Sequence, residues 1–317
     1  MRKELNIYEP KVKTYLRQGF PTSIVGNKDW LYEKYVNMFY CDADPNNLYV
    51  NYLDYDFYKE DGVFHKGYHL FPNCKKKELV KEMQGALDTG WYYFGKWNEL
   101  FVPGTYYHKM GIPYEHANLI YGYDDIKKYF LVEGYLADWK WHRYLISYKT
   151  FLKATVVNLD DMIEFETYKV NDSFQYVFDY SRMLKEWEEY FESLNDEAEH
   201  KYYGLKGVLR FWKDIRNYYE KQATLDQTSI FIFYERAHFM TERLGFIQKD
   251  HPAIYAKMME YGQVLEDFKL LNMLMIKCNT RPEAHLAKII SDKGIEVISR
   301  EAEILRDIYN ILKGGKL

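Results

Sequence analysis

The sequence is poor in cysteine and has no long hydrophobic run. Only three of its 317 residues are cysteine. This odd number lacks the spacing of metal ligands, so neither a disulfide framework nor a metal site is expected. No segment reaches the roughly 18 consecutive apolar residues that a membrane-spanning helix needs. A reduced, cytoplasmic protein without membrane association is therefore predicted.

The chain also lacks an excess of positive charge, with 43 Lys and Arg against 47 Asp and Glu. The formal net charge is −4, which gives no broad attraction to phosphate backbones, so nucleic-acid binding is not expected. The first residues, Met1–Asn6, have no apolar segment after their basic residues. A secretory signal is therefore not expected, which again favours the cytoplasm.

Aromatic residues, by contrast, are abundant. The chain has 33 Tyr, 19 Phe and 7 Trp. Tyrosine carries a polar tip on an apolar body, so the core and any cleft should be rich in side chains that also form hydrogen bonds. The length of 317 residues suits two domains better than one compact core.

The pattern of the chain changes near residue 175. Before it, short aromatic and β-branched runs alternate with Gly, Pro and Asp, which predicts an α+β domain over residues 1–175 with a mainly antiparallel sheet. The predicted strands are residues 35–40, 48–58, 91–102, 117–123 and 128–135. Two helices are predicted in this domain, at residues 75–89 and at residues 147–154, the second with Ser147 as its N-cap.

After residue 175 the apolar residues recur with helical spacing, which predicts an all-α helical domain over residues 176–317. The predicted helices are residues 176–194, 203–222, 226–248, 252–278 and 281–313. One stretch of the third helix is polar, with Glu235, His238, Glu242 and Arg243. A solvated, salt-bridged helix face is the simplest interpretation of this stretch, and a ligand-facing role is the alternative.

The stretch from Tyr114 to Tyr135 predicts a β-hairpin with its turn at Asp124 and Asp125. His116 opens the first strand, and Glu133 lies near the end of the second. The hairpin is expected to bring the imidazole beside the carboxylate, which would fix the tautomer of the ring and stabilise its protonated form. His116 is therefore the candidate catalytic base and Glu133 its candidate partner, whereas a structural histidine at a strand start is the alternative.

Three motifs around this hairpin carry a family resemblance. They are Gly90-Trp-Tyr-Tyr-Phe94, Trp97-Asn-Glu-Leu-Phe-Val-Pro103 and Tyr121-Gly-Tyr-Asp-Asp125. Together with His116 they resemble the papain-like acyltransferases of the butirosin-biosynthesis type. The helical segment from Leu225 to Leu244 is similar to the helical half of family members found in peptide-antibiotic gene clusters.

The resemblance implies a papain-like (cysteine-protease-like) domain followed by a helical domain. It also implies acyl or peptidyl transfer, cyclisation or hydrolysis in natural-product biosynthesis, such as that of nonribosomal peptides. The substrate would be a small molecule, a peptide or an intermediate on an acyl or peptidyl carrier protein. No cofactor is implied other than the phosphopantetheine arm of such a partner.

The nucleophile of that family is a cysteine at the start of a helix, where the helix amides and the histidine lower the pKa of the thiol. The matching stretch, residues 24–36, contains Asp29 and Trp30 but no cysteine. Cys41 is the nearest thiol and the one candidate nucleophile for a covalent route, although it ends a predicted strand. By the resemblance, Trp30 fills or lines the space that a thioester enters. The expected substrate-binding residues are Trp30, Asp29, Asn98, Glu99, Tyr121 and Tyr123.

Two functions therefore remain open. The first is an acyl-transferring enzyme in which His116 acts as general base, with a thiol or the substrate's own amine as the nucleophile. The second is a binding protein of the same fold that has lost its nucleophile and holds a carrier protein or a peptide intermediate. A stable acyl adduct after incubation with an acyl-pantetheine thioester would favour the first.

Overall fold

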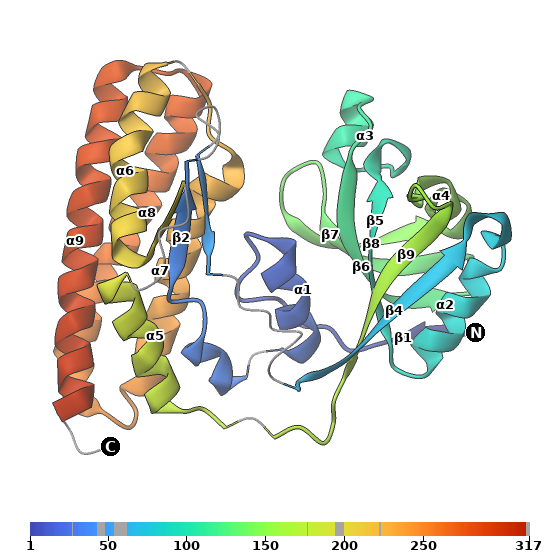
Figure 1. Ribbon diagram of the computed structural model, residues 1–317, viewed down its shortest axis with the longest axis horizontal. Coiled ribbons are helices and arrows are strands. Elements are labelled where there is room, and N and C mark those ends of the chain that lie inside the picture. Colours follow the sequence, from blue (N-terminus) through green and yellow to red (C-terminus); the bar gives the residue numbers. More distant parts are fainter. Residues whose placement is uncertain are drawn as a thin grey trace. The chain divides into compact units, whose positions relative to one another are not determined.

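The computed structural model describes residues 1–26, 28–42, 48–53, 62–175, 177–193, 200–221 and 223–314. The chain divides into two compact units, which the colours of Figure 1 help to trace. Unit 1 contains Met1–Asn27 and Asp56–Tyr176, and unit 2 contains Lys28–Tyr55 and Val177–Leu317. The segment Lys28–Tyr55, predicted as part of the first domain, thus belongs to the helical unit, because its strands pair with a strand of that unit.

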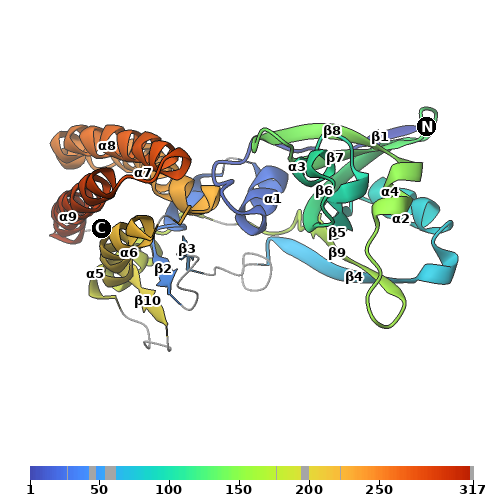
Figure 2. The same ribbon diagram turned by 90° about the horizontal axis from the view of Figure 1, so that it is seen from above.

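Unit 1 is built on an antiparallel sheet of seven strands, in which β6 and β7 form the predicted hairpin. The strand order is β4-β9-β5-β6-β7-β8, and β1 pairs with β6 (Figure 2). The strands are β1 (Arg2–Glu4), β4 (Phe64–Pro72), β5 (Tyr92–Asn98), β6 (Glu115–Asp124), β7 (Tyr129–Tyr135), β8 (Trp141–Ser147) and β9 (Met162–Val170). Of these, β1, β4, β8 and β9 were not predicted.

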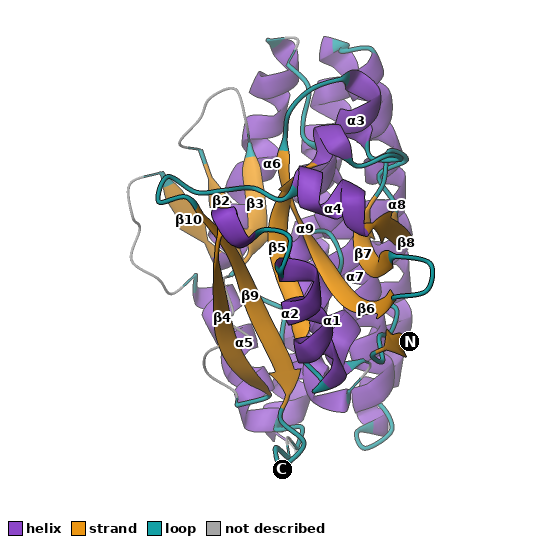
Figure 3. Cartoon of the chain, turned by 90° about the vertical axis from the view of Figure 1, so that its right-hand side faces the viewer, coloured by secondary structure: helices purple, strands orange, loops and turns teal. Residues whose placement is uncertain are grey.

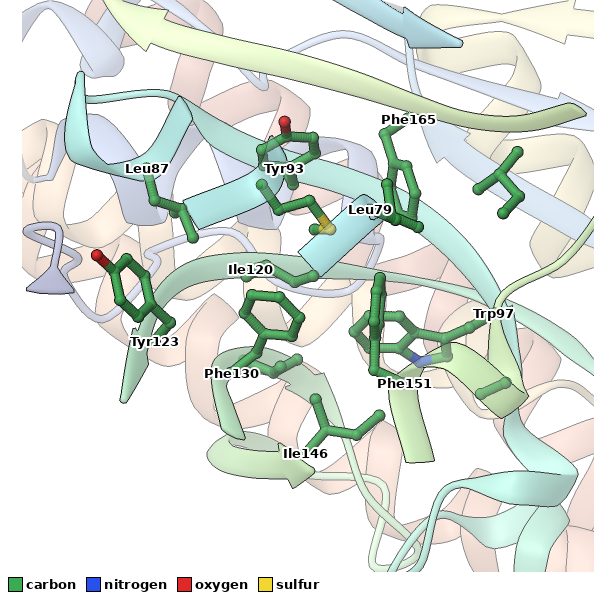
Figure 4. Close-up of a cluster of buried hydrophobic side chains, with 14 of the residues drawn as sticks. Leu79, Leu87, Tyr93, Trp97, Ile120, Tyr123, Phe130, Ile146, Phe151 and Phe165 are labelled. Atoms are coloured by element: carbon green, nitrogen blue, oxygen red, sulfur yellow. The ribbon is translucent and has the colours of Figure 1, made fainter. Parts of the chain in front are cut away.

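One face of this sheet is covered by α2 (Leu79–Asp88) and α4 (Tyr148–Ala154), which are the two predicted helices. Figure 4 shows the buried cluster that they form with the strands, including Leu79, Leu87, Tyr93, Trp97, Ile120, Phe130, Phe151 and Phe165. The N-cap of α4 is the predicted one, because the Ser147 hydroxyl accepts a hydrogen bond from the Thr150 backbone N–H at 3.0 Å. Ile120, Tyr123, Phe130 and Val132 are the hairpin side chains that belong to this cluster, so they point to the face that α2 and α4 cover.

The opposite face of the sheet carries α1 (Leu16–Val25), a helix that was not predicted. The Phe20 ring lies 5.4 Å from the Phe94 ring and 5.1 Å from the Trp141 ring, between centroids. Phe94 and Trp97 are three residues apart on β5, so their side chains point to opposite faces. The remaining short elements of unit 1 are η2 (Asn73–Lys75), η3 (Glu99–Phe101) and α3 (Tyr106–Met110).

Unit 2 contains the five predicted helices, but it is not all-α. Its helices are η1 (Asp29–Glu33), α5 (Tyr180–Glu192), α6 (Gly204–Glu220), α7 (Gln227–Ile247), η4 (Pro252–Ile254), α8 (Tyr255–Thr280) and α9 (Ala284–Gly314). A three-stranded antiparallel sheet accompanies them in the order β10-β2-β3, with the strands β2 (Met38–Cys41), β3 (Tyr49–Tyr52) and β10 (Lys201–Tyr203) (Figure 3). Residues 54–58 of the predicted strand 48–58 lie outside the described residues.

The chain is therefore an α+β protein with an antiparallel sheet and a helical C-terminal region, as the sequence predicts. In α6 and α9 the apolar residues recur every three to four positions. This spacing gives each helix one buried apolar stripe. Within the described ranges, no helix combines the length and the apolar character that crossing a membrane requires.

Candidate functional site

The candidate site is a histidine–carboxylate pair at the start of β6. The Nδ1 atom of His116 lies 2.7 Å from Oε1 of Glu99. The Glu99 side chain is only 3% exposed, whereas that of His116 is 22% exposed. An ionised carboxylate can only accept hydrogen bonds, so Nδ1 of the ring carries the proton in this contact. That contact leaves Nε2 as the ring atom that can accept a proton from a substrate.

The register of β5 and β6 explains why Glu99 is the partner. Trp97 pairs with His116 across the two strands, and Glu99 follows two residues later, at the start of η3. The Glu99 N–H also donates to the Tyr114 carbonyl oxygen at 2.8 Å, which keeps the start of η3 beside β6. Glu99 was expected to line the substrate site, and the structure makes it the partner of His116.

Glu133, the predicted partner, does not reach His116. It pairs with Leu119 across β6 and β7, and Leu119 is three residues from His116. Side chains alternate between the faces of a strand, so an odd separation puts Glu133 and His116 on opposite faces of the sheet. His116 therefore contacts Glu99 and not Glu133. The pairing of β6 with β7 places the Glu133 carboxylate on the face of the sheet that α1 covers.

Glu133 occupies a buried position of its own. It is fully buried, and neither of its carboxylate oxygens makes a hydrogen bond of standard geometry within the described chain. Arg143 Nε lies 3.7 Å from Oε1. Burial raises the pKa of the Glu133 carboxyl above its ordinary value, while the nearby Trp141, Ser23 and Arg143 side chains partly oppose this rise. Glu133 is therefore a buried carboxylate on the α1 face of the sheet and not the partner of His116.

The raised pKa of Glu133 gives a pH-dependent prediction. A carboxyl whose pKa is higher in the folded state stabilises the fold below its ordinary pKa, near 4.3, and loses that contribution as the pH rises through the raised value. Replacing Glu133 with glutamine is therefore expected to increase the free energy of unfolding at pH 8 by on the order of 1 kcal/mol. The gain should shrink as the pH falls towards 4, as measured by urea unfolding across this range.

The control for this variant is Glu115→Gln, which changes a solvent-exposed carboxylate on β6. It should leave the free energy of unfolding within about 0.5 kcal/mol of the wild-type value at every pH. A Glu133→Gln protein that is less stable than the wild type at pH 8 would show that the ionised carboxylate is well satisfied in the fold.

Two further polar side chains support the position of His116. The Asn118 side-chain amide donates to the His116 carbonyl oxygen at 3.2 Å. The Tyr144 hydroxyl donates to Oδ1 of Asn118 at 2.7 Å. Burial and then the negative charge of Glu99 raise the pKa of Tyr144 above its ordinary value, so its hydroxyl stays protonated as a donor. Sequence reasoning missed both residues, because only the strand register brings them beside the pair.

Three other residues of unit 1 were expected to bind substrate, and each contributes to the fold. Oδ1 of Asn98 accepts the Leu100 backbone N–H at 3.0 Å and so caps η3. Tyr123 is buried in the core, with its hydroxyl donating to Asp88 at 2.8 Å. Tyr121 is also buried, which raises its pKa to about 12. Both tyrosines are thus buried, and their role in substrate binding stays a prediction.

The hairpin turn is as predicted. Oδ1 of Asp124 accepts hydrogen bonds from the backbone N–H groups of Ile126 and Lys127, both at 3.0 Å. These bonds lower the pKa of Asp124, the Lys127 contact most strongly. Asp124 is thus a turn-forming residue, and its carboxylate is occupied by the backbone.

The three remaining candidates lie in unit 2. Cys41 is a half-buried free thiol at the end of β2, where it pairs with Tyr49 and Lys201. Trp30 is buried in η1, and Asp29 is exposed at its start. In the stretch over residues 24–36 that matches the nucleophile region of the family, α1 ends at Val25 and η1 covers Asp29–Glu33. The roles of these three residues at a site with His116 stay predictions.

No protein-family model matches the chain, and no curated protein sequence matches it. The described residues also contain no group of three or more His, Cys, Asp or Glu side chains placed to hold a metal ion. The functional argument therefore starts from the geometry of His116 and Glu99 themselves.

Proposed function

We propose that the chain is a general-base acyltransferase in which His116 takes the proton and Glu99 orients its ring. The observation that carries this proposal is the 2.7 Å contact between a buried carboxylate and a partly exposed imidazole. A buried carboxylate on Nδ1 holds the ring in one tautomer and stabilises the imidazolium that forms during the reaction. Nε2 of His116 is then set to accept a proton on the exposed side.

The proposed reaction transfers an acyl group from a thioester to an amine. The amine nitrogen attacks the thioester carbonyl carbon and forms the new carbon–nitrogen bond. Nε2 of His116 accepts the proton that the amine loses. The carbon–sulfur bond then breaks, and the imidazolium returns the proton to the departing thiolate. Water in place of the amine would give hydrolysis, and an amine of the same intermediate would give cyclisation.

Direct transfer to the amine is favoured over a covalent acyl-enzyme. Within the described residues, no serine, threonine or cysteine side chain forms a hydrogen bond with Nε2 of His116, which an activated nucleophile would need. Cys41 ends a strand and so lacks activation by a helix dipole. The resemblance to papain-like acyltransferases supports the choice of a thioester donor, with the phosphopantetheine arm of a carrier protein as the natural source.

The proposal is tested with an acyl-pantetheine thioester and a primary amine. The wild-type protein is expected to release free pantetheine thiol and form the amide faster than the buffer background, as followed by a thiol reagent and product mass. Intact protein mass should show no lasting acyl adduct. Cys41→Ser should retain the wild-type rate.

Two results would contradict this proposal in different ways. An acyl adduct that disappears in Cys41→Ser, together with the activity, would establish a covalent route through that thiol. Thioester binding without any reaction above background would instead favour the alternative, a binding protein for a carrier-bound or peptide intermediate.

A further inference from the structure

Four aromatic side chains form a surface cluster beside His116, here called the aromatic platform: Tyr106, Tyr107, Tyr114 and Trp139. Trp139 is 43% exposed and Tyr114 is 44% exposed. Tyr106 and Tyr107, on α3, are half-buried. Large aromatic side chains normally gain stability by burial, so exposed rings gathered at one place indicate a binding surface.

The rings of the platform are ordered by one another. The Tyr107 and Tyr114 rings stack with their centroids 3.9 Å apart and their planes 16° apart. The Trp139 ring lies 5.0 Å from the Tyr106 ring at 40°. Rings that are fixed in advance lose little side-chain entropy when a ligand binds, which favours affinity.

The backbone of Trp139 provides an independent observation. Its φ angle is 57°, in the left-handed region that bulky residues rarely adopt. Tyr35, with a φ of 62°, is the comparable aromatic residue, but it is buried at 5% exposure and packing offsets its strain. Trp139 adopts this conformation in the turn between β7 and β8, where its N–H donates to the Leu136 carbonyl oxygen at 3.0 Å. The turn thus holds the indole at the surface, where it is 43% exposed.

Ring contacts and hydrogen bonds connect the platform to the pair formed by His116 and Glu99. The Tyr114 ring centroid is 5.8 Å from that of His116. The Thr105 hydroxyl, at the N-cap of α3, donates to the Glu99 carbonyl oxygen at 3.1 Å. The Ala137 N–H donates to the Gly104 carbonyl oxygen at 2.9 Å, which ties the turn that carries Trp139 to the start of α3. A group stacked on the platform would therefore lie close to His116.

The polar side chains around the platform favour an uncharged ligand. Asp138 is already bonded to His142 at 2.9 Å and to the Lys140 backbone N–H at 3.1 Å. Nδ1 of His108 lies 2.7 Å from the Leu100 carbonyl oxygen. These bonds use part of the hydrogen-bonding capacity of Asp138 and His108, whereas an aromatic ring requires none of it. The charged residues that neighbour the platform in the sequence, Lys109, Lys140, Glu115 and Asp138, carry no net charge. Their sum therefore favours neither a cation nor an anion.

We propose that the aromatic platform binds an uncharged, flat aromatic ring of the substrate and places the reacting group of that substrate beside His116. The assignment of the ring to the substrate rests on the proposed acyl-transfer function. Binding of the ring does not, because it requires no turnover. Stacking on the exposed Trp139 and Tyr114 rings would supply the affinity.

The test measures binding of N-acetyl-L-tryptophanamide to the full chain by ligand-observed NMR titration. N-acetyl-L-leucinamide, tetramethylammonium and glucose serve as non-aromatic, cationic and carbohydrate probes. The tryptophan derivative is expected to bind most tightly. Trp139→Ala and Tyr114→Ala should each weaken its binding about tenfold, the loss of one stacked ring. Tyr68→Ala, which removes an exposed tyrosine on β4, should leave the affinity unchanged.

A second variant separates binding from folding. Trp139→Gly removes the ring and also relieves the backbone strain, since glycine adopts a positive φ without cost. It should bind the probe as weakly as Trp139→Ala while remaining at least as stable to urea as the wild type. Unchanged probe affinity in Trp139→Ala and Tyr114→Ala, or preference for one of the other three probes, would overturn the proposal.

Failure of the ring proposal is distinguishable from failure of the acyl-transfer proposal. Glu99→Gln should abolish most of the thioester reaction yet keep the affinity for N-acetyl-L-tryptophanamide within about twofold, because Glu99 is buried behind His116. Ring binding without thioester reaction would contradict only the enzymatic proposal. Thioester reaction without ring binding would contradict only the assignment of the platform.

Discussion

Replacing His116 with alanine is expected to lower the rate of acyl transfer from an acyl-pantetheine thioester by about 100-fold or more. General-base catalysis by a positioned side chain typically contributes factors of this size or larger. Glu99→Gln should lower the rate about tenfold or more, because an amide can donate as well as accept and no longer enforces the Nδ1–H tautomer. The measurement is thiol release under saturating thioester and amine.

The two residues should act as one unit. The double variant His116→Ala/Glu99→Gln is expected to be no slower than His116→Ala alone, because Glu99 acts through the ring. The control is His65→Ala, which removes an exposed histidine on β4 and should retain the wild-type rate. Losses that multiply in the double variant would show that Glu99 contributes independently of His116.

The tautomer itself can be observed without turnover. The 15N chemical shifts of neutral His116 should report a proton on Nδ1 in the wild-type protein, since Glu99 accepts from this atom. In Glu99→Gln the population should move towards a proton on Nε2. A ring that carries its proton on Nε2 in the wild type would contradict the proposed orientation, because that atom could not act as the base.

Replacing Glu301 with glutamine is expected to lower the free energy of unfolding of unit 2 by about 3–5 kcal/mol, the cost of leaving one buried charge without its partner. Nη1 of Arg236 lies 2.8 Å from Oε1 and 2.7 Å from Oε2 of Glu301. The Tyr261 hydroxyl donates to Oε1 at 2.5 Å. Both charged side chains are almost completely buried. Urea unfolding, followed through the transition of this unit, measures the effect.

The cause of this large effect is the burial of Arg236. Burial alone would lower the pKa of its guanidinium, but the Glu301 carboxylate outweighs that and raises it above the ordinary value. Glu301→Gln removes this compensation without changing the size of the side chain. Arg236 also donates to the Val36 carbonyl oxygen at 3.1 Å, so the pair attaches the segment Lys28–Tyr55 to the helices of its own unit.

An exposed ion pair provides the matched control. Nε of Arg216 lies 2.7 Å from Oε1 of Glu220, and both side chains are exposed on α6. Glu220→Gln should change the free energy of unfolding by less than about 0.5 kcal/mol. The double variant Arg236→Met/Glu301→Leu should recover most of the loss of Glu301→Gln, because it leaves no charge unpaired. A loss equal to that of the exposed control would show that water solvates the Arg236 charge.

The polar stretch on α7 shows where helical periodicity was insufficient. The sequence suggested a solvated face through Glu235, His238, Glu242 and Arg243, and His238 is indeed exposed. Arg243, however, is fully buried, and burial together with the charge of Arg236 lowers its pKa to about 9. Its guanidinium donates to the carbonyl oxygens of Tyr32 and Lys34. These carbonyls come from a segment about 210 residues away in the sequence, which α7 by itself cannot reveal.

Local features of the chain were determined by the sequence alone. The five long helices of unit 2, the N-cap at Ser147 and the turn at Asp124 depend on side chains within one or two turns of each other. For these elements the apolar spacing and the short-range hydrogen bonds act within one continuous segment. The choice of His116 as the candidate base also came from such a segment, the hairpin that it opens.

The partner of His116 was decided only by the tertiary structure. Glu99 lies 17 residues before His116, and Glu133 lies 17 residues after it (133 − 116 = 17), so sequence distance cannot choose between them. The strand register chooses, because Trp97 pairs with His116 whereas Leu119 pairs with Glu133. A shift of one residue in the pairing of β6 with β7 would reverse the face of Glu133, and this register depends on packing across the whole sheet.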